Sequence, residues 1–157
     1  AYGFASWRIG YMMIPSFLLE SVQKIQDTNV ICPSVISQFA AVGALETGRS
    51  YCEEKLTAIA QVREIVLSEL ETIRHICTVP QADGAFYFLL KVHTEMDTME
   101  LVKQLIRDHR VAVLPGFTFG LENGCYLRVG YGALEKETAI EGIQRLVTGL
   151  KSIVETR

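Results

Sequence analysis

The sequence predicts an α/β chain in which a small, helix-covered sheet of the α+β kind follows a long helix. Through residues 16–47, apolar residues recur every three or four positions, which is the spacing of helices. A periodic run then extends for about 25 residues from near Ser50. From about residue 75 onward, short alternating stretches are interleaved with further helical patterns, as expected for helices packed on a sheet.

The first part of the chain has one expected strand and two expected helices. Residues 7–14 are apolar and end at Pro15, which predicts a strand and its stop. Ser16 can serve as an N-cap, and residues 27–33 read as a loop. Ser34 opens a second helix, which we expect to be buried on more than one side because it is mostly apolar. The apolar residues of the two helices are Leu18, Leu19, Val22, Ile25, Val35, Ile36, Phe39, Val42 and Leu45.

The periodic run after Gly48 predicts one long helix that ends near residue 74. At about 1.5 Å per residue it would reach about 37 Å, which is longer than a small domain needs for itself. We therefore expect this helix to connect two domains. Its apolar stripe consists of Leu56, Ile59, Val62, Val66, Leu70 and Ile73.

The last part of the chain has three expected strands, at residues 86–92, 111–114 and 126–131. Between the first two, Asp97-Thr98-Met99-Glu100 has the form of a capping box that starts a helix. Pro115 begins an aromatic turn, which could wall a pocket but is more often a packing device. A final helix begins near Glu135.

Charge and cysteine content exclude several function classes. The formal net charge is -3 and Lys and Arg are evenly scattered, so the basic stripe of a nucleic-acid-binding protein is absent. No apolar run reaches the roughly 18 residues that indicate a membrane span. The cysteines show no CxxC spacing and have no suitably placed histidine, which argues for reduced thiols and against a metal site. They are Cys32, Cys52, Cys77 and Cys125.

Arg8 and Arg128 are the candidate site residues. Each is set in an expected strand, where a guanidinium is costly to bury unless an anion meets it. Alternation places Arg128 on the face away from the apolar side chains, and Gly130 and Gly132 leave space beside it for another backbone or a ligand. Local pattern alone allows either an internal ion pair or an anion-binding role for both arginines. Two such residues suggest two anionic groups, one on a cofactor and one on a substrate.

Several short motifs occur in a fixed order along the chain. They are residues 1–11 (Ala-Tyr-Gly-Phe-Ala-Ser-Trp-Arg-Ile-Gly-Tyr), Cys32-Pro33-Ser34 with Gln38, Gly84-Ala85-Phe86-Tyr87, residues 115–120 (Pro-Gly-Phe-Thr-Phe-Gly) and Leu127-Arg128-Val129. In this order and at this spacing they resemble the C-terminal part of a class I/II aminotransferase of the aspartate aminotransferase superfamily. These are fold-type I enzymes that depend on pyridoxal phosphate. Each motif is weak alone, but together they carry the resemblance over the full length.

The resemblance implies a site. Arg8 would hold the cofactor phosphate, because it matches the arginine eight residues after the family's Schiff-base lysine. Arg128 would bind the substrate α-carboxylate. The lysine itself would fall immediately before Ala1, so this chain would contain no catalytic residue, and we expect it to be inactive alone. The whole enzyme would transfer an amino group between an amino acid and a 2-oxo acid.

The resemblance also implies an organisation. Residues 1–47 would be the tail of the large cofactor-binding domain, residues 48–74 the interdomain linking helix and residues 75–157 the small C-terminal domain. The parent would be a cytoplasmic homodimer with no metal, nucleic acid or membrane partner.

Two other interpretations stay open. The same scaffold could serve a different pyridoxal-phosphate enzyme, such as a carbon–sulfur lyase or a cyclopropane-carboxylate synthase, because a grip on an α-carboxylate suits all of them. The chain could instead be a free-standing α/β binding or assembly module. That interpretation predicts that its own chain covers the helix that begins after Ser34, whereas a part of a larger enzyme would expose a large apolar patch.

Overall fold

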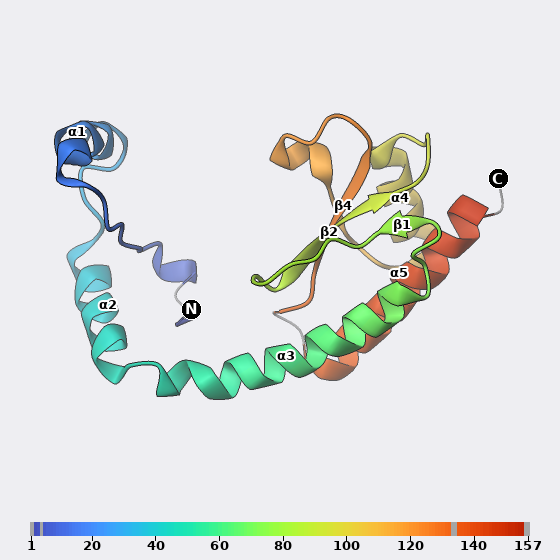
Figure 1. Cartoon of the computed structure of the whole chain (residues 1–157), viewed down its shortest axis with the longest axis horizontal. Coiled ribbons are helices and arrows are strands. Elements are labelled where there is room, and N and C mark those ends of the chain that lie inside the picture. The colour runs from blue at the N-terminus through green and yellow to red at the C-terminus, as the bar shows by residue number, and fades with distance from the viewer. Residues whose placement is uncertain (1, 4, 133–134, 156–157) are drawn as a thin grey trace. The chain divides into compact units, whose positions relative to one another are not determined.

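The computed structural model describes residues 2–3, 5–132 and 135–155 of the chain. The chain divides into two compact units, Ala1–Leu56 and Thr57–Arg157, which run from blue to teal and from green to red in Figure 1. In its described residues the first unit is helical, and the second combines helices with a small sheet. The predicted α/β class is confirmed.

The described residues of the first unit contain no strand, so the strand predicted at residues 7–14 is wrong. A strand needs a neighbour that pairs with its backbone N–H and C=O groups, and this part of the chain supplies none. Helix α1 also continues into residues expected to be a loop. The elements are η1 (Ala5–Trp7), η2 (Ser16–Leu18), α1 (Leu19–Asn29), α2 (Val35–Thr47) and the start of α3 (Ser50–Glu71).

Ser34 caps α2, as the sequence predicts. Its Oγ accepts a hydrogen bond from the Ser37 backbone N–H (3.4 Å), and the Ser37 hydroxyl donates to the Trp7 carbonyl (3.2 Å). The expectation that α2 is buried on more than one side is wrong, since Phe39 is 75% exposed. A helix that is apolar on several sides needs several covering elements, and the described part of this unit has too few. The other exposed apolar residues of α2 are Val35, Ile36, Val42 and Leu45.

Helix α3 is the long helix expected after Gly48, and it ends at Glu71, before the predicted residue 74. Its apolar stripe enters the core of the second unit at Val62 and continues through Val66 and Leu70. Ile73 is buried in the same core, although it lies in the turn after the helix. The periodic pattern therefore runs past the helix end.

The second unit is built on a four-stranded antiparallel sheet with the strand order β1-β2-β4-β3. Strands β2 and β4 match two of the predicted strands, whereas β1 is too short to show alternation. The predicted strand at residues 111–114 is largely wrong, because β3 contains only its last residue and Pro115. Proline is tolerated there since β3 is an edge strand. The strands are β1 (Cys77–Thr78), β2 (Tyr87–Val92), β3 (Leu114–Pro115) and β4 (Cys125–Gly130).

Alternation along β2 and β4 separates a buried face of the sheet from an open face. Phe88 pairs with Val129 and Leu90 with Leu127, and all four side chains are buried. Helices α3, α4 (Thr98–His109) and α5 (Lys136–Glu155) complete this core (Figure 1). The main helical contributors are Val62, Val66, Leu70, Leu101, Leu105, Ile143, Leu146 and Leu150. Residues on the other face of the sheet are exposed or half-buried.

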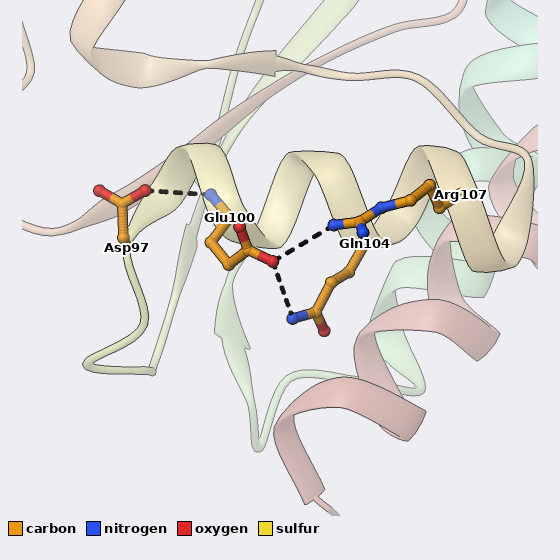
Figure 2. Close-up of polar contacts among 4 residues, drawn as sticks. All are labelled: Asp97, Glu100, Gln104 and Arg107. Carbon is orange, nitrogen blue, oxygen red and sulfur yellow. Dashed lines mark hydrogen bonds and ion pairs between the residues drawn. The ribbon is translucent and has the colours of Figure 1, made fainter.

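Asp97 caps α4, as the capping-box sequence predicts, but the reciprocal half of the box is absent. Asp97 Oδ1 accepts a hydrogen bond from the Glu100 backbone N–H (3.0 Å). The Glu100 carboxylate instead accepts from the Gln104 amide and the Arg107 guanidinium, each at 3.4 Å (Figure 2). One side chain therefore caps the helix, and the other joins contacts along its surface.

Helix α5 begins at Lys136, close to the predicted start. Gln144 Nε2 on α5 donates to Glu69 Oε1 on α3 (3.2 Å), which joins the two helices. Gly149 permits a close approach to α4, because a Cβ there would lie 2.7 Å from Leu105 Cδ2. Across the described residues, every helix is too short or too polar to cross a lipid bilayer.

Candidate functional site

Arg128 lies on the open face of the sheet, in the middle of β4. Its register partners are Leu89 on β2 and Leu114 on β3, so it has a paired strand on each side. The neighbouring residues Leu127 and Val129 point into the core, which confirms the predicted alternation. The backbone of Arg128 is therefore fixed by a paired strand on each side. Its half-buried side chain projects from the face of the sheet that the helices do not cover.

Two aromatic rings hold the Arg128 guanidinium. Its Cζ lies 4.2 Å from the centroid of the Tyr87 ring and 5.2 Å from that of Phe119. Both distances fall within the range of cation–π contacts. Tyr87 belongs to β2 and Phe119 to the turn after β3, so the rings reach Arg128 from the strands on either side of β4.

No carboxylate pairs with Arg128 among the described residues. Apolar side chains from Leu89 and Leu114 stand opposite it, and the aromatic rings offer no full negative charge. A half-buried guanidinium without an ionic partner favours an external anion, because its planar donors match a carboxylate or phosphate. The internal ion pair that the sequence left open is absent from this part of the chain.

The two glycines near Arg128 have different roles. A Cβ on Gly130 would meet no atom within 4 Å, so space does exist beside Arg128, as predicted. A Cβ on Gly132 would lie 2.3 Å from Phe86 Cβ, so another segment of the chain, and not a ligand, occupies the space there. Phe86 fills that position, and the glycine permits its packing.

The aromatic turn after β3 forms the 3-10 helix η3 (Gly116–Phe119). A Cβ on Gly116 would lie 2.4 Å from Tyr126 Cβ, so the start of the turn packs directly on β4. The Thr118 hydroxyl donates to the Pro115 carbonyl (2.7 Å), and Gly120 ends the helix at a φ of 84°. The packing role expected for this turn is present, and the same packing places Phe119 beside Arg128.

Arg8 is not in a strand and is not buried. It follows η1 with a left-handed φ of 52°, and its Nη1 donates to the Ala5 carbonyl (2.9 Å). The side chain is exposed, and no carboxylate among the described residues pairs with it. Arg8 belongs to the first unit and Arg128 to the second, so each is a separate anion-binding candidate.

The cysteines do not form a reactive site. None of the four forms a disulfide bond, and Cys32 is exposed whereas the other three are buried. Burial raises the pKa of Cys77 to about 11, and the nearby Arg74 charge lowers it only in part. Burial also raises the pKa of Cys125. The described residues hold no cluster of His, Cys, Asp or Glu that could bind a metal ion.

Sequence reasoning missed Tyr87 and Phe119 as partners of Arg128. Tyr87 belongs to the Gly84-Ala85-Phe86-Tyr87 motif, and alternation along β2, which buries Phe88, is the signal that could have placed it on the open face. The pairing register was the missing information. It pairs Tyr87 with Gly130, two residues along β4 from Arg128, and so makes Tyr87 and Arg128 diagonal neighbours.

The chain matches known proteins in sequence. A family model for aminotransferase class I and II matches residues 1–146. The aromatic aminotransferase ISS1 of Arabidopsis thaliana is 34% identical, over 98% of this chain and 39% of its own length. An aspartate aminotransferase of Rhizobium meliloti is 31% identical, over the same 98% and 39%. The chain thus spans about 39% of the length of these curated relatives.

The fold matches a solved structure as well. The aromatic aminotransferase from Pyrococcus horikoshii OT3 superposes with a TM-score of 0.77 and 30% identity, over 94% of this chain and 40% of that one. The names of these three proteins refer to aromatic amino acids or to aspartate, and each of them contains the word aminotransferase. The resemblance inferred from the short motifs and the predicted fold are both confirmed. The chain belongs to the class I and II aminotransferase family.

Proposed function

We propose that this chain forms the substrate-carboxylate grip of a pyridoxal-phosphate-dependent aminotransferase. The observation that carries the proposal is the Arg128 guanidinium, which two aromatic rings hold on the open face of the sheet without a carboxylate partner in the described residues. A bidentate pair with an α-carboxylate would satisfy that charge and orient the substrate. Family membership implies pyridoxal phosphate as the cofactor.

Arg8 fits the role of a cofactor phosphate anchor. Its guanidinium is exposed, and the one hydrogen bond described for it, to the Ala5 carbonyl, uses a single N–H donor. Several donors stay available for phosphate oxygens. We further propose residues 1–47 as the tail of the cofactor domain, residues 48–74 as the linking helix and residues 75–157 as the small domain.

The chemistry divides between the cofactor and the protein. Pyridoxal phosphate supplies the electron sink that stabilises negative charge at the substrate Cα. Arg128 would hold the carboxylate and so fix which Cα bond can break, and Arg8 would fix the phosphate end of the cofactor. The family resemblance implies a lysine that moves the Cα proton and lies eight residues before Arg8. Residues 1–7 contain no lysine.

We propose that the 157-residue chain alone does not turn over amino acids, because it does not contain that lysine. The assay mixes the chain with pyridoxal phosphate, an acidic or aromatic amino acid and a 2-oxo acid, and measures the new amino acid. Turnover by the purified chain would contradict the proposal. A complete enzyme that includes these residues is the positive control, and we expect it to transaminate.

The same assay separates transamination from the related activities. A carbon–sulfur lyase would release a thiol from a thioether amino acid without consuming the 2-oxo acid. A cyclopropane-forming synthase would likewise leave the 2-oxo acid untouched. The relatives named above favour transamination, because each is called an aminotransferase. The binding-module interpretation has less support, since its prediction of a covered α2 is wrong.

We also propose that the whole enzyme is a cytoplasmic homodimer, as the family resemblance implies. Cross-linking and sedimentation of the complete enzyme would test the dimer, and cell fractionation would test its location.

A further inference from the structure

We propose that Tyr87 and Phe119 are positioning residues that hold the Arg128 guanidinium in one orientation and make its grip selective for planar carboxylates. This inference rests on the proposed function, in that Arg128 meets a substrate carboxylate. It adds a second role to the aromatic turn and to the motif that contains Tyr87. It also specifies which anionic groups the site would reject.

The first step of the argument is the placement of the rings. The Tyr87 centroid lies 4.2 Å from Arg128 Cζ and the Phe119 centroid 5.2 Å from it. The rings approach from β2 on one side of β4 and from the turn after β3 on the other. A long arginine side chain normally samples many rotamers, and two contacts from separate elements restrict that freedom before a ligand arrives.

The second step is the cost of building this arrangement. Tyr87 is 38% exposed and Phe119 is 51% exposed, so neither ring contributes much to the core. Aromatic side chains are large apolar groups that usually gain stability from deep burial. Here both rings lie outside the buried core, and the Tyr87 ring also meets the Phe86 ring edge-on at 6.2 Å. The contact that the two rings share is the one with the guanidinium.

The third step is the effect on anions. Aromatic ring faces carry partial negative charge, so they attract the guanidinium but repel a nearby anionic oxygen. A carboxylate has two oxygens, and both can accept hydrogen bonds from the planar fork. A phosphonate carries a third oxygen, which would stand out of the shared plane and meet the aromatic walls. The arrangement therefore favours carboxylates over tetrahedral anions of similar size.

The test uses the 157-residue chain with isotope-labelled arginine side chains. The Arg128 Nε–H signal is assigned from its loss in Arg128→Gln, and it is followed by NMR during titrations with acetate and with methylphosphonate. We expect Tyr87→Leu and Phe119→Leu each to weaken acetate binding by about fivefold to tenfold. We also expect each to lower the ratio of acetate to methylphosphonate affinity. Tyr87→Phe keeps a ring and should restore both quantities.

The matched control is Phe117→Leu. Phe117 lies in the same turn and is exposed to a similar degree, but no contact with Arg128 is described for it. The same acetate affinity and anion ratio in the parent chain and in both leucine variants at Tyr87 and Phe119 would overturn the proposal. So would an equal loss in Phe117→Leu, because that would indicate a general disturbance of the turn. If Tyr87→Leu disrupts the amide spectrum, Phe119→Leu decides the question.

A parallel measurement on the complete enzyme separates this inference from the proposed function. If the enzyme transaminates, the leucine variants should raise KM for the amino acid about fivefold to tenfold. If it does not transaminate but the chain still prefers acetate through both rings, the proposed function fails and the positioning role stands. Transamination with the parent KM in both leucine variants would overturn the positioning role alone.

Discussion

Tyr87 on β2 contacts Arg128 on β4 diagonally across the sheet. In the sheet register, Tyr87 stands opposite Gly130, and Arg128 stands opposite Leu89, two residues further along β2. Diagonal neighbours at this spacing are separated by about 7–8 Å at the backbone, which an aromatic side chain can bridge. The Tyr87 ring comes to 4.2 Å from Arg128 Cζ, and a Cβ on Gly130 would still meet no atom within 4 Å. The contact is therefore a diagonal cross-strand pair, and open space remains beside Gly130.

The buried thiol of Cys77 should make the stability of the chain depend on alkaline pH. Its pKa is raised from 9.0 to about 11 in the folded state, so the unfolded chain loses this proton first. The stability that the neutral thiol contributes is full below pH 9.0 and is lost as the pH rises towards about 11. Urea unfolding at pH 8 and pH 10.5 measures the free energy of unfolding at each pH. Between these two pH values, it should decrease less for Cys77→Ala than for the parent.

Cys32→Ala is the matched control for this pH dependence, because Cys32 is exposed. It should lose as much stability as the parent between the two pH values. An equal decrease in Cys77→Ala would show that the Cys77 thiol is not the source of the effect.

Loss of the α4 cap should destabilise the chain. Asp97→Ala removes the acceptor of the Glu100 N–H bond and should lower the free energy of unfolding by about 1 kcal/mol. Asp97→Ser keeps a capping oxygen and should cost much less. Glu95→Ala removes a nearby exposed carboxylate that does not cap the helix, and it should change the urea midpoint little. If Asp97→Ala and Glu95→Ala gave equal midpoints, the cap would be without effect.

Two glycines of α5 should respond in opposite ways to the same substitution. Gly142→Ala meets no atom within 4 Å and should stabilise the chain by about 0.5–1 kcal/mol, since alanine is the better helix former. Gly149→Ala puts a Cβ 2.7 Å from Leu105 and 2.9 Å from the His109 ring. Overpacking of this kind costs about 1–3 kcal/mol. In thermal unfolding, the melting temperature should be higher than that of the parent for Gly142→Ala and lower for Gly149→Ala.

That ranking is a sensitive check on how closely α4 and α5 pack. Both substitutions gain the same helix propensity, so the difference between them reports the contacts of position 149 with Leu105 and His109 on α4. Equal melting temperatures for the two variants would mean that the helices lie further apart than described.

The helices of both units could be predicted from the sequence, whereas two of the expected strands, at residues 7–14 and 111–114, could not. Strand β4 and helix α5 bury their apolar residues within the second unit, so period and structure agree. Residues 7–14 have the composition of a strand, but pairing is a property of two segments, and the described first unit offers no partner. Local pattern likewise could not show that α2 would stay exposed.

The sequence likewise predicted one part of the site and missed another. Alternation and motif order identified Arg128, and its position on the open face is confirmed. The aromatic partners depend on register and on the short β3 strand, which local periodicity does not determine. Arg8 shows the opposite case, because the motif singled it out while the expected strand around it is wrong. Motifs located the two arginines, and tertiary contacts decide their surroundings.

The most direct test of the account compares Arg128→Gln with Arg107→Gln in a complete enzyme that includes these residues. Arg107 is an exposed arginine of α4 that pairs with Glu100, so its loss controls for charge. We expect Arg128→Gln to lower kcat/KM for the amino acid by about 100-fold or more, because a bidentate charged pair is lost. Arg107→Gln should leave it close to the parent value. Equal kcat/KM in the two variants would contradict the assignment of Arg128 as the carboxylate grip.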